Sequence, residues 1–263
     1  MGHLGRVFAV VLLAVLAACS SGGGSQRPQG VVAGQGRGPQ FLDTAPHYWV
    51  GGHPYDNEVH GIDISRYQGA IDWGRVRGSG VSFAFIKATE GADHADPNFQ
   101  RYWYEAGQAR IPRGAYHFFY FCRSGAEQAA WFIAHVPRER GAMPPVIDLE
   151  WTSSRTCPRR PPPDEVLREA RIFKDILHRY YGQRPIIYTT VDFYRENNLG
   201  RWPEEFWLRS VAGHPRITYP GQNYSFWQYT GTGLVPGIQG NVDLNVFGGN
   251  ASQWRLWLRR RLQ

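Results

Sequence analysis

The stretch PPVIDLEW, from Pro144 to Trp151, places two carboxylates one residue apart at the end of an apolar run. Side chains on a β-strand alternate between its faces, so Asp148 and Glu150 point to the same side, with Cα atoms roughly 7 Å apart. Two acids placed this way repel each other, which a purely structural strand has no use for. A site that needs one carboxyl group protonated and the other ionised does use such a pair. The stretch therefore indicates a catalytic strand end.

Short β-rich runs alternate with helical patterns on both sides of this pair. Helices are expected after the caps Asp72, Asp96 and Ser124. The strongest helical pattern covers residues 163–182 and stops at Gly182. Its apolar stripe predicts burial of Val166, Ala170, Phe173, Ile176, Leu177 and Tyr180. Eight strands are expected at residues 61–65, 82–89, 114–121, 145–151, 185–190, 205–211, 224–230 and 242–247.

Strand, helix and strand in succession imply parallel pairing through right-handed crossovers. The last three strands lie too close together in the sequence for full helices between them. We therefore predict an α/β fold of one domain, a closed TIM-like barrel that is regular β/α at first and mostly β later. Catalytic groups of such barrels collect at the C-terminal strand ends. Asp63, Glu90, Asp148, Glu150 and Asp243 lie at or near such ends, although Asp243 stands toward the start of its strand. Glu90 either enters the cleft or pairs with Lys87, and we prefer the ion pair.

The first residues are typical of an export signal. Arg6 precedes an uncharged run that is too short to span a bilayer comfortably, and the run ends in LAAC at Cys19. This junction resembles the lipobox of bacterial lipoproteins, which implies cleavage before Cys19 and acylation of its thiol; the alternative is an ordinary signal peptide. We expect a signal peptide over residues 1–18, a Gly/Ser/Gln/Pro tether over residues 19–40 and the folded domain over residues 41–263.

Two cysteines remain after the signal, Cys122 and Cys157. Export favours their oxidation. Cys122 follows one predicted strand and Cys157 lies shortly after the next, so adjacent parallel strands bring the two following loops together. We predict a disulfide between them.

The formal net charge is +7, carried almost entirely by arginine. This balance favours anionic partners, and export makes nucleic acid the weakest of these. The C-terminal segment QWRLWLRRRLQ has two interpretations. It lies on an anionic membrane with Trp254, Leu256, Trp257 and Leu258 inward, or, as we prefer, it packs its Trp and Leu on the domain.

Other chemistry has little support in the sequence. His94, His117, His135 and His178 show no metal-ligand spacing, and there is no Gly-rich phosphate loop or nucleophile elbow. We therefore expect no metal and no cofactor.

Seven segments in order, GIDISRYQGAIDW, AFIKATEG, RGAYHFF, PVIDLEW, IIYTT, FWQYT and VDLNVF, resemble the glycoside hydrolase family 25 lysozymes, the Chalaropsis-type muramidases. The resemblance covers about residues 60–247. It implies a modified barrel of five β/α units and three further strands. It also implies a peptidoglycan hydrolase that cleaves the β-1,4 bond between N-acetylmuramic acid and N-acetylglucosamine. We expect the protein to be a monomer whose partners are the glycan strands of peptidoglycan.

Carried over residue by residue, the resemblance makes Glu150 the general acid and Asp148 the second carboxylate. Asp63 and Asp243 match acids that line the same pocket. We expect Asp148 to stay ionised while neighbouring carboxylates and aromatic walls raise the pKa of Glu150. Spacing leaves open whether Asp148 is a nucleophile or steadies the substrate's 2-acetamido group; the resemblance favours the latter, with retention of configuration.

Aromatic residues near the strand ends are candidates for stacking on sugar rings, and of these we select Tyr116, Tyr188 and Trp227. The alternative for each is a buried barrel aromatic. For the whole chain, the alternatives to a lipid-tethered muramidase are a catalytically inactive peptidoglycan-binding lipoprotein and an exported factor aimed at other cells. Ser20, which follows the lipobox, favours an outer-membrane anchor facing the periplasm.

Overall fold

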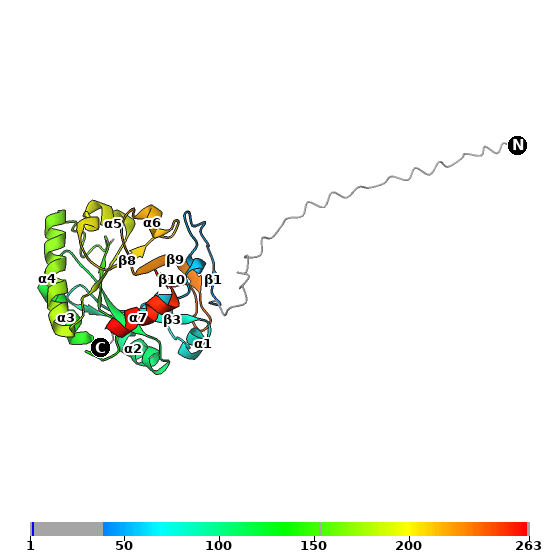
Figure 1. The fold of residues 1–263 in the computed structure, drawn as a ribbon, viewed down its shortest axis with the longest axis horizontal. Helices are drawn as coiled ribbons and strands as arrows, with labels where there is room; N and C mark the ends of the chain where they lie inside the picture. The colour runs from blue at the N-terminus through cyan, green and yellow to red at the C-terminus, as the bar shows by residue number, and fades with distance from the viewer. Residues whose placement is uncertain (1, 3–38, 153, 262–263) are drawn as a thin grey trace. The chain divides into compact units, whose positions relative to one another are not determined.

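The computed structural model describes residue 2, residues 39–152 and residues 154–261 (Figure 1). The predicted signal peptide, Cys19 and the tether up to residue 38 lie outside the described residues, so those predictions stay untested. No helix in the described part of the chain is long and apolar enough to cross a bilayer.

Eight strands form a closed barrel, and they coincide with the eight strands predicted from the sequence. Two further strands, β1 (Leu42–Asp43) and β4 (His94–Ala95), pair with β9 and β3. The barrel closes because β10 pairs with both β9 and β2. In pairing order its strands are β2 (His60–Ile64), β3 (Val81–Glu90), β5 (Arg113–Phe118), β6 (Val146–Leu149), β7 (Ile186–Thr189), β8 (Phe206–Arg209), β9 (Phe226–Leu234) and β10 (Val242–Phe247).

Strand direction gives the barrel two distinct ends. The strands from β2 to β9 pair in parallel, whereas β10 is antiparallel to both of its neighbours. We call the C-terminal end of the parallel strands the mouth and the opposite end the base. Because β10 runs the other way, its start lies at the mouth, which explains how Asp243 reaches the same end as the other acids.

Helices and short 3-10 turns surround the barrel, mostly between parallel strands. Asp72 caps α1, a capping box of Ser124 and Glu127 begins α3, and Gly182 ends α4 in the left-handed conformation, all as expected. The elements are η1 (Pro54–Asp56), η2 (Arg66–Gln68), α1 (Trp73–Gly78), α2 (Phe99–Gln108), α3 (Gly125–His135), α4 (Pro163–Tyr181), α5 (Val191–Glu196), η3 (Leu199–Arg201), α6 (Pro215–Thr218) and α7 (Ala251–Arg261).

Two details of the helices differ from the sequence prediction. The N-cap of α2 is Asn98, while Asp96 accepts the Asn98 N–H from just outside the helix. On α4, Tyr180 is 41% exposed, and Lys174 is buried instead, in an ion pair with Glu204. The apolar stripe is thus narrower than predicted, because a paired lysine packs at its edge.

The core consists of two apolar layers, one inside the barrel and one between the barrel and its helices. Phe83, Phe85, Trp207 and Phe226 are among the residues that fill the inside toward the base. Helix α7 packs Trp254 against Phe83 and Phe226 of this inner layer. Figure 1 shows the red helix α7 in front of the barrel strands. The preferred packing interpretation of the C-terminal segment is therefore confirmed, except that Leu256 is 40% exposed.

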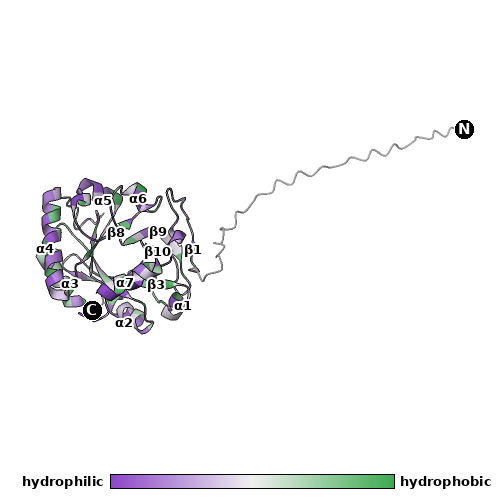
Figure 2. Cartoon of the chain, in the orientation of Figure 1, coloured by the Kyte–Doolittle hydropathy of each residue, from purple (hydrophilic) through white to green (hydrophobic). Residues whose placement is uncertain are grey.

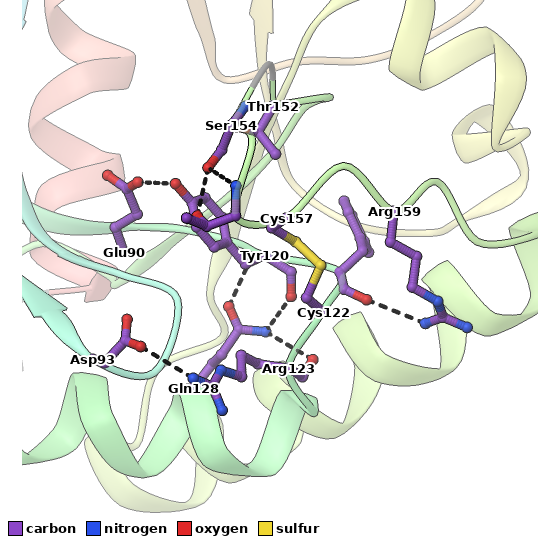
Figure 3. The surroundings of a disulfide bond; sticks show 12 residues. Glu90, Asp93, Tyr120, Cys122, Arg123, Gln128, Thr152, Ser154, Cys157 and Arg159 are labelled. Carbon is purple, nitrogen blue, oxygen red and sulfur yellow. Dashed lines mark hydrogen bonds and ion pairs between the residues drawn. A yellow bond between two sulfur atoms is a disulfide. The ribbon is translucent and has the colours of Figure 1, made fainter.

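The predicted disulfide between Cys122 and Cys157 is confirmed (Figure 3). It joins the loop after β5 to the loop after β6. Gln128 of α3 fixes the first loop, since its side chain accepts the Tyr120 N–H and donates to the Tyr120 carbonyl. The segment that follows Glu150 is thus covalently attached to its neighbour at the mouth.

Candidate active site

Four carboxylates lie at the mouth on inward-facing positions of the barrel strands. Asp63 belongs to β2, Asp148 to β6 and Asp243 to β10, and Glu150 follows β6 directly. Strand alternation places them there, because Val146 below Asp148 belongs to the inner core layer whereas Ile147 and Leu149 belong to the outer one. The alternation thus gives Asp148 and Glu150 the shared face predicted from PPVIDLEW.

Asp63 is held by two amide groups. Gln228 Nε2 and Asn245 Nδ2 each donate to Asp63 Oδ2 over 2.8 Å. Both amides are fixed in turn, since Tyr188 donates its hydroxyl to Gln228 Oε1 and Trp207 donates Nε1–H to Asn245 Oδ1. These partners orient each amide so that its NH2 group faces the carboxylate. The Asp63 side chain is therefore positioned by a two-layer hydrogen-bond network.

Burial and like charge raise the pKa values of the mouth carboxylates. Burial is the main cause that raises the pKa of Glu150 to about 7, and Arg209 opposes the shift. Burial also raises the pKa of Asp63 to about 6, although the Asn245 and Gln228 amides counteract it. For Asp243, burial and the Asp63 charge raise the pKa well above its usual range. Such groups titrate as a set and hold protons near neutral pH.

Asp148 differs from its expected state. Burial raises the pKa of the Asp148 carboxyl well above its usual range, and the Glu150 charge adds to the shift. Its Oδ1 atom is buried and has no hydrogen-bond partner among the described residues. Asp148 therefore competes with Glu150 for a proton, whereas the sequence analysis expected it to stay ionised. A donor that reaches Oδ1 would favour the ionised form.

Two cations face the carboxylates. Lys87 Nζ pairs with Glu90 Oε2 at 2.6 Å, which confirms the structural interpretation of Glu90, and Tyr120 donates its hydroxyl to the other Glu90 oxygen (Figure 3). The Lys87 charge opposes the rise in the pKa of both Asp148 and Glu150 without cancelling it. Arg209, which ends β8, likewise opposes the rise in the pKa of Glu150, Asp63 and Asp243.

Sequence reasoning missed Arg209 and Gln228 as members of the site. Arg209 is the single polar residue of β8, and Gln228 is the first polar residue of β9; each stands two positions after an inward aromatic, Trp207 and Phe226 respectively. The period-2 alternation is the signal that finds them once the inward face of these strands is known.

The three aromatic candidates occupy different places. Tyr116 is partly exposed at the mouth side of the inner layer, and the charges of Asp63 and Asp148 raise its pKa in addition to burial. Tyr188 is 6% exposed beneath the carboxylates. Trp227 has no exposed surface, points to the outer layer and donates Nε1–H to the Ser210 carbonyl. Trp227 is thus a buried barrel aromatic, and its selection for sugar stacking was wrong.

His117 is buried outside the barrel between Thr89 and Gln128. Burial lowers its pKa to about 4, so it is neutral at physiological pH and supports packing. Within residues 39–152 and 154–261, no cluster of three or more His, Cys, Asp or Glu side chains is arranged to hold a metal ion.

Carboxyl groups with raised pKa values at the C-terminal end of a barrel's parallel strands are typical of glycosidases. The chain belongs to the glycosyl hydrolases family 25, whose family model matches residues 62–238. It is 36% identical to the uncharacterized protein YegX of Escherichia coli K12 over 76% of this chain and 73% of that protein. It is 30% identical to lysozyme M1 of Streptomyces globisporus over 95% of this chain and 91% of the relative.

The fold agrees with solved structures of the same family. A family 25 glycosyl hydrolase from Bacillus anthracis superposes with a TM-score of 0.73 at 34% identity, covering 81% of this chain and 97% of the other. A bacterial lysozyme from Streptomyces coelicolor superposes with a TM-score of 0.67 at 31% identity, over 78% of this chain and 97% of the other. The chain is therefore a glycoside hydrolase with the family's modified barrel.

Proposed function

We propose that this protein is a muramidase that cleaves the β-1,4 bond between N-acetylmuramic acid and N-acetylglucosamine in peptidoglycan. The observation that carries the proposal is Glu150, whose pKa of about 7 lets it hold a proton at neutral pH inside a barrel mouth lined with acids. Relatives named lysozyme and N,O-diacetylmuramidase support the choice of substrate.

Glu150 acts as the general acid. Cleavage of a glycosidic bond needs a proton on the leaving oxygen as the bond from C1 to that oxygen breaks. A carboxyl group with a pKa near the working pH is both protonated often enough and acidic enough to give that proton. Once ionised, Glu150 accepts a proton from the water that completes hydrolysis, which returns the site to its starting state.

Asp148 supports the positive charge that develops at C1. Its partnerless Oδ1 is an acceptor suited to the N–H of the substrate's 2-acetamido group. That hydrogen bond would lower the pKa of Asp148 and orient the acetamido oxygen to attack C1 with retention of configuration. Direct attack by Asp148 is the other retaining route. An inverted anomer in the first product, followed by NMR, would exclude both.

Asp63, Asp243 and Tyr116 complete the substrate side of the site. Asp63 presents its second oxygen beside the amides that fix it, and Asp243 lies across from it. Tyr116 is the partly exposed aromatic of the three candidates, so its ring is the one placed to contact a sugar face. Tyr188 lies beneath the carboxylates and orients the Gln228 amide that holds Asp63.

Digestion of purified peptidoglycan tests the activity. The parent chain should release new muramic-acid reducing ends, whereas Glu150→Gln should release none above background. The matched control is Glu105→Gln on α2, since Glu105 accepts the Trp73 Nε1–H and a glutamine oxygen can accept the same bond. Binding without release by parent and control would identify a catalytically inactive wall-binding protein instead.

We further propose that Cys19 carries a lipid anchor and that the protein works as a monomer at the outer membrane, facing the periplasm. The LAAC junction and the polar segment after it support this placement. Mass spectrometry of the mature chain should find an acylated Cys19 at the N-terminus. A lipid-free mature protein, or fractionation solely with the inner membrane, would contradict the placement.

A further inference from the structure

The base of the barrel carries exposed arginines, and the catalytic mouth lies at the opposite end. Helix α7 crosses the base and contains no acidic residue. Its buried side consists of Trp254 with the partly buried Trp257 and Leu258. Its outer side presents Arg255, Leu256, Arg259 and Arg260, and Figure 2 shows hydrophilic residues at the C-terminal part of α7. This exposed side is therefore basic, with one apolar side chain between the charges.

Neighbouring loops extend the positive charge. Arg110 lies in the turn that enters β5, and Arg138 and Arg140 lie in the segment that leads to β6; all three are exposed. We call Arg110, Arg138, Arg140, Arg255, Arg259 and Arg260 the basal arginines. Among the described residues, none of them pairs with a carboxylate.

Nearby acids do not cancel this charge. Glu139 pairs with Arg113, and Glu205 pairs with Arg261 and accepts the Trp257 Nε1–H. Glu58, in the segment before β2, accepts the N–H of Ala251 at the start of α7. The helix dipole stabilises cations in the last turn of α7, but it accounts neither for Arg255 nor for the arginines of the loops. A structural role therefore leaves most of the basal arginines unexplained.

The N-terminal segment joins the domain at the same end. The Gln40 N–H donates to the Ser79 carbonyl over 2.8 Å, and Gly80 lies against Pro39. Ser79 and Gly80 immediately precede β3, so they belong to the base. Residues 39 and 40 therefore contact the domain at its base.

We propose that the base is a docking surface for a membrane leaflet containing anionic phospholipid. Arginines near such a surface are attracted to its negative potential, and Leu256, 40% exposed between them, fits the headgroup boundary. Docking by the base leaves the carboxylates on the far side of the inner core layer, because Asp63 pairs with Phe85, which lies about 13 Å along β3 from its start at Val81. The catalytic site then faces away from the membrane. This docking is independent of both the activity and the acylation of Cys19.

Vesicle binding tests the surface. Residues 19–263 carrying Cys19→Ala retain the complete barrel and lack the acceptor thiol. This protein should sediment with phosphatidylglycerol/phosphatidylcholine vesicles, much less with phosphatidylcholine alone, and less as salt is added. R255Q/R259Q/R260Q should weaken binding to the anionic vesicles roughly 100-fold. R101Q/R168Q/R171Q removes three exposed charges from helices α2 and α4 and should bind like the parent.

Several outcomes would overturn the proposal. Equal binding to neutral and anionic vesicles would do so, as would equal losses in the basal and control triple variants. Binding to poly(glycerol phosphate) but not to the vesicles would make the surface a wall-polymer site. Thermal unfolding and hydrolysis of soluble glycan should match the parent in the basal variant. If that variant does not fold, R138Q/R140Q outside α7 should still reduce vesicle binding by roughly tenfold or more.

Discussion

Asp243 on β10 lies directly opposite Asp63 on β2, as Cα partners of an antiparallel pair. Like charges opposite each other on one sheet face repel, and here Asp63 is buried and Asp243 is half-buried. Reversal of β10 brings the acids together, because an antiparallel strand presents its start where its neighbours present their ends. The repulsion keeps protons in the mouth, which a general acid requires.

Asp63→Asn should lower the pKa of Asp243. The charge of ionised Asp63 helps to raise the pKa of Asp243, so a neutral asparagine at position 63 removes part of that shift. The asparagine oxygen can still accept from Gln228 and Asn245, so the network remains. Carboxyl carbon NMR titration of Asp243 measures the shift. Asp175→Asn, exposed on α4, is the control and should leave Asp243 unchanged. An Asp243 pKa that rises in Asp63→Asn would contradict the repulsion.

Arg209→Gln should move the falling limb of the pH profile of kcat/KM to higher pH. The general acid must be protonated, so kcat/KM falls as pH rises through the pKa of Glu150, which is about 7. Arg209 favours the ionised form of Glu150, and its removal raises that pKa. The profile of each variant on soluble glycan measures the limb. Arg75→Gln on α1 should keep the parent profile, and a limb displaced to lower pH in Arg209→Gln would exclude this role for the arginine.

Glu150→Gln should stabilise the protein at alkaline pH. Burial raises the pKa of Glu150 from 4.5 to about 7, so the folded state binds more protons than the unfolded state between these values. The free energy of unfolding therefore decreases as pH rises from about 4.5 to about 7. A glutamine does not ionise, so it avoids the cost of burying a charged carboxylate. We expect its free energy of unfolding to exceed that of the parent by about 1–3 kcal/mol at pH ~8 and to differ little at pH ~4.

Urea unfolding at the two pH values measures the difference. Glu105→Gln on α2 is the control for the change from carboxylate to amide, since the glutamine oxygen can still accept the Trp73 Nε1–H. A Glu150→Gln variant that is less stable than the parent at the higher pH would mean that the ionised carboxylate is stabilised in the fold.

Sequence patterns predicted all eight barrel strands because each alternates apolar residues toward a core. They also predicted the carboxylate cluster, because strand ends of a closed parallel barrel meet at one mouth. Trp227 was assigned to the wrong side, since an aromatic in an apolar run fits either face. Phe226 and Gln228 point inward, so Trp227 between them points outward. This became clear only from the pairing of β9 with β10.

The sequence could not predict which of the two carboxyl groups, Asp148 or Glu150, holds a proton more strongly. Asp148 and Glu150 share a face, but their pKa values depend on how deeply each is buried and on cations from other strands. Lys87 and Arg209 come from β3 and β8, far from PPVIDLEW in the chain. Only the assembled barrel brings them to the carboxylates, so local spacing could not rank the two acids.

The pair C122S/C157S should cost the protein about 3–4 kcal/mol of unfolding free energy. The disulfide spans 35 residues of sequence, and a cross-link of this length restricts the unfolded chain by about that amount. Urea unfolding of the oxidised parent against the double variant measures the loss. Reductant should destabilise the parent to a similar degree and leave the double variant unaffected, which separates the bond from the substitutions. A loss below about 1 kcal/mol would indicate that Gln128 and the surrounding packing hold the two loops without the cross-link.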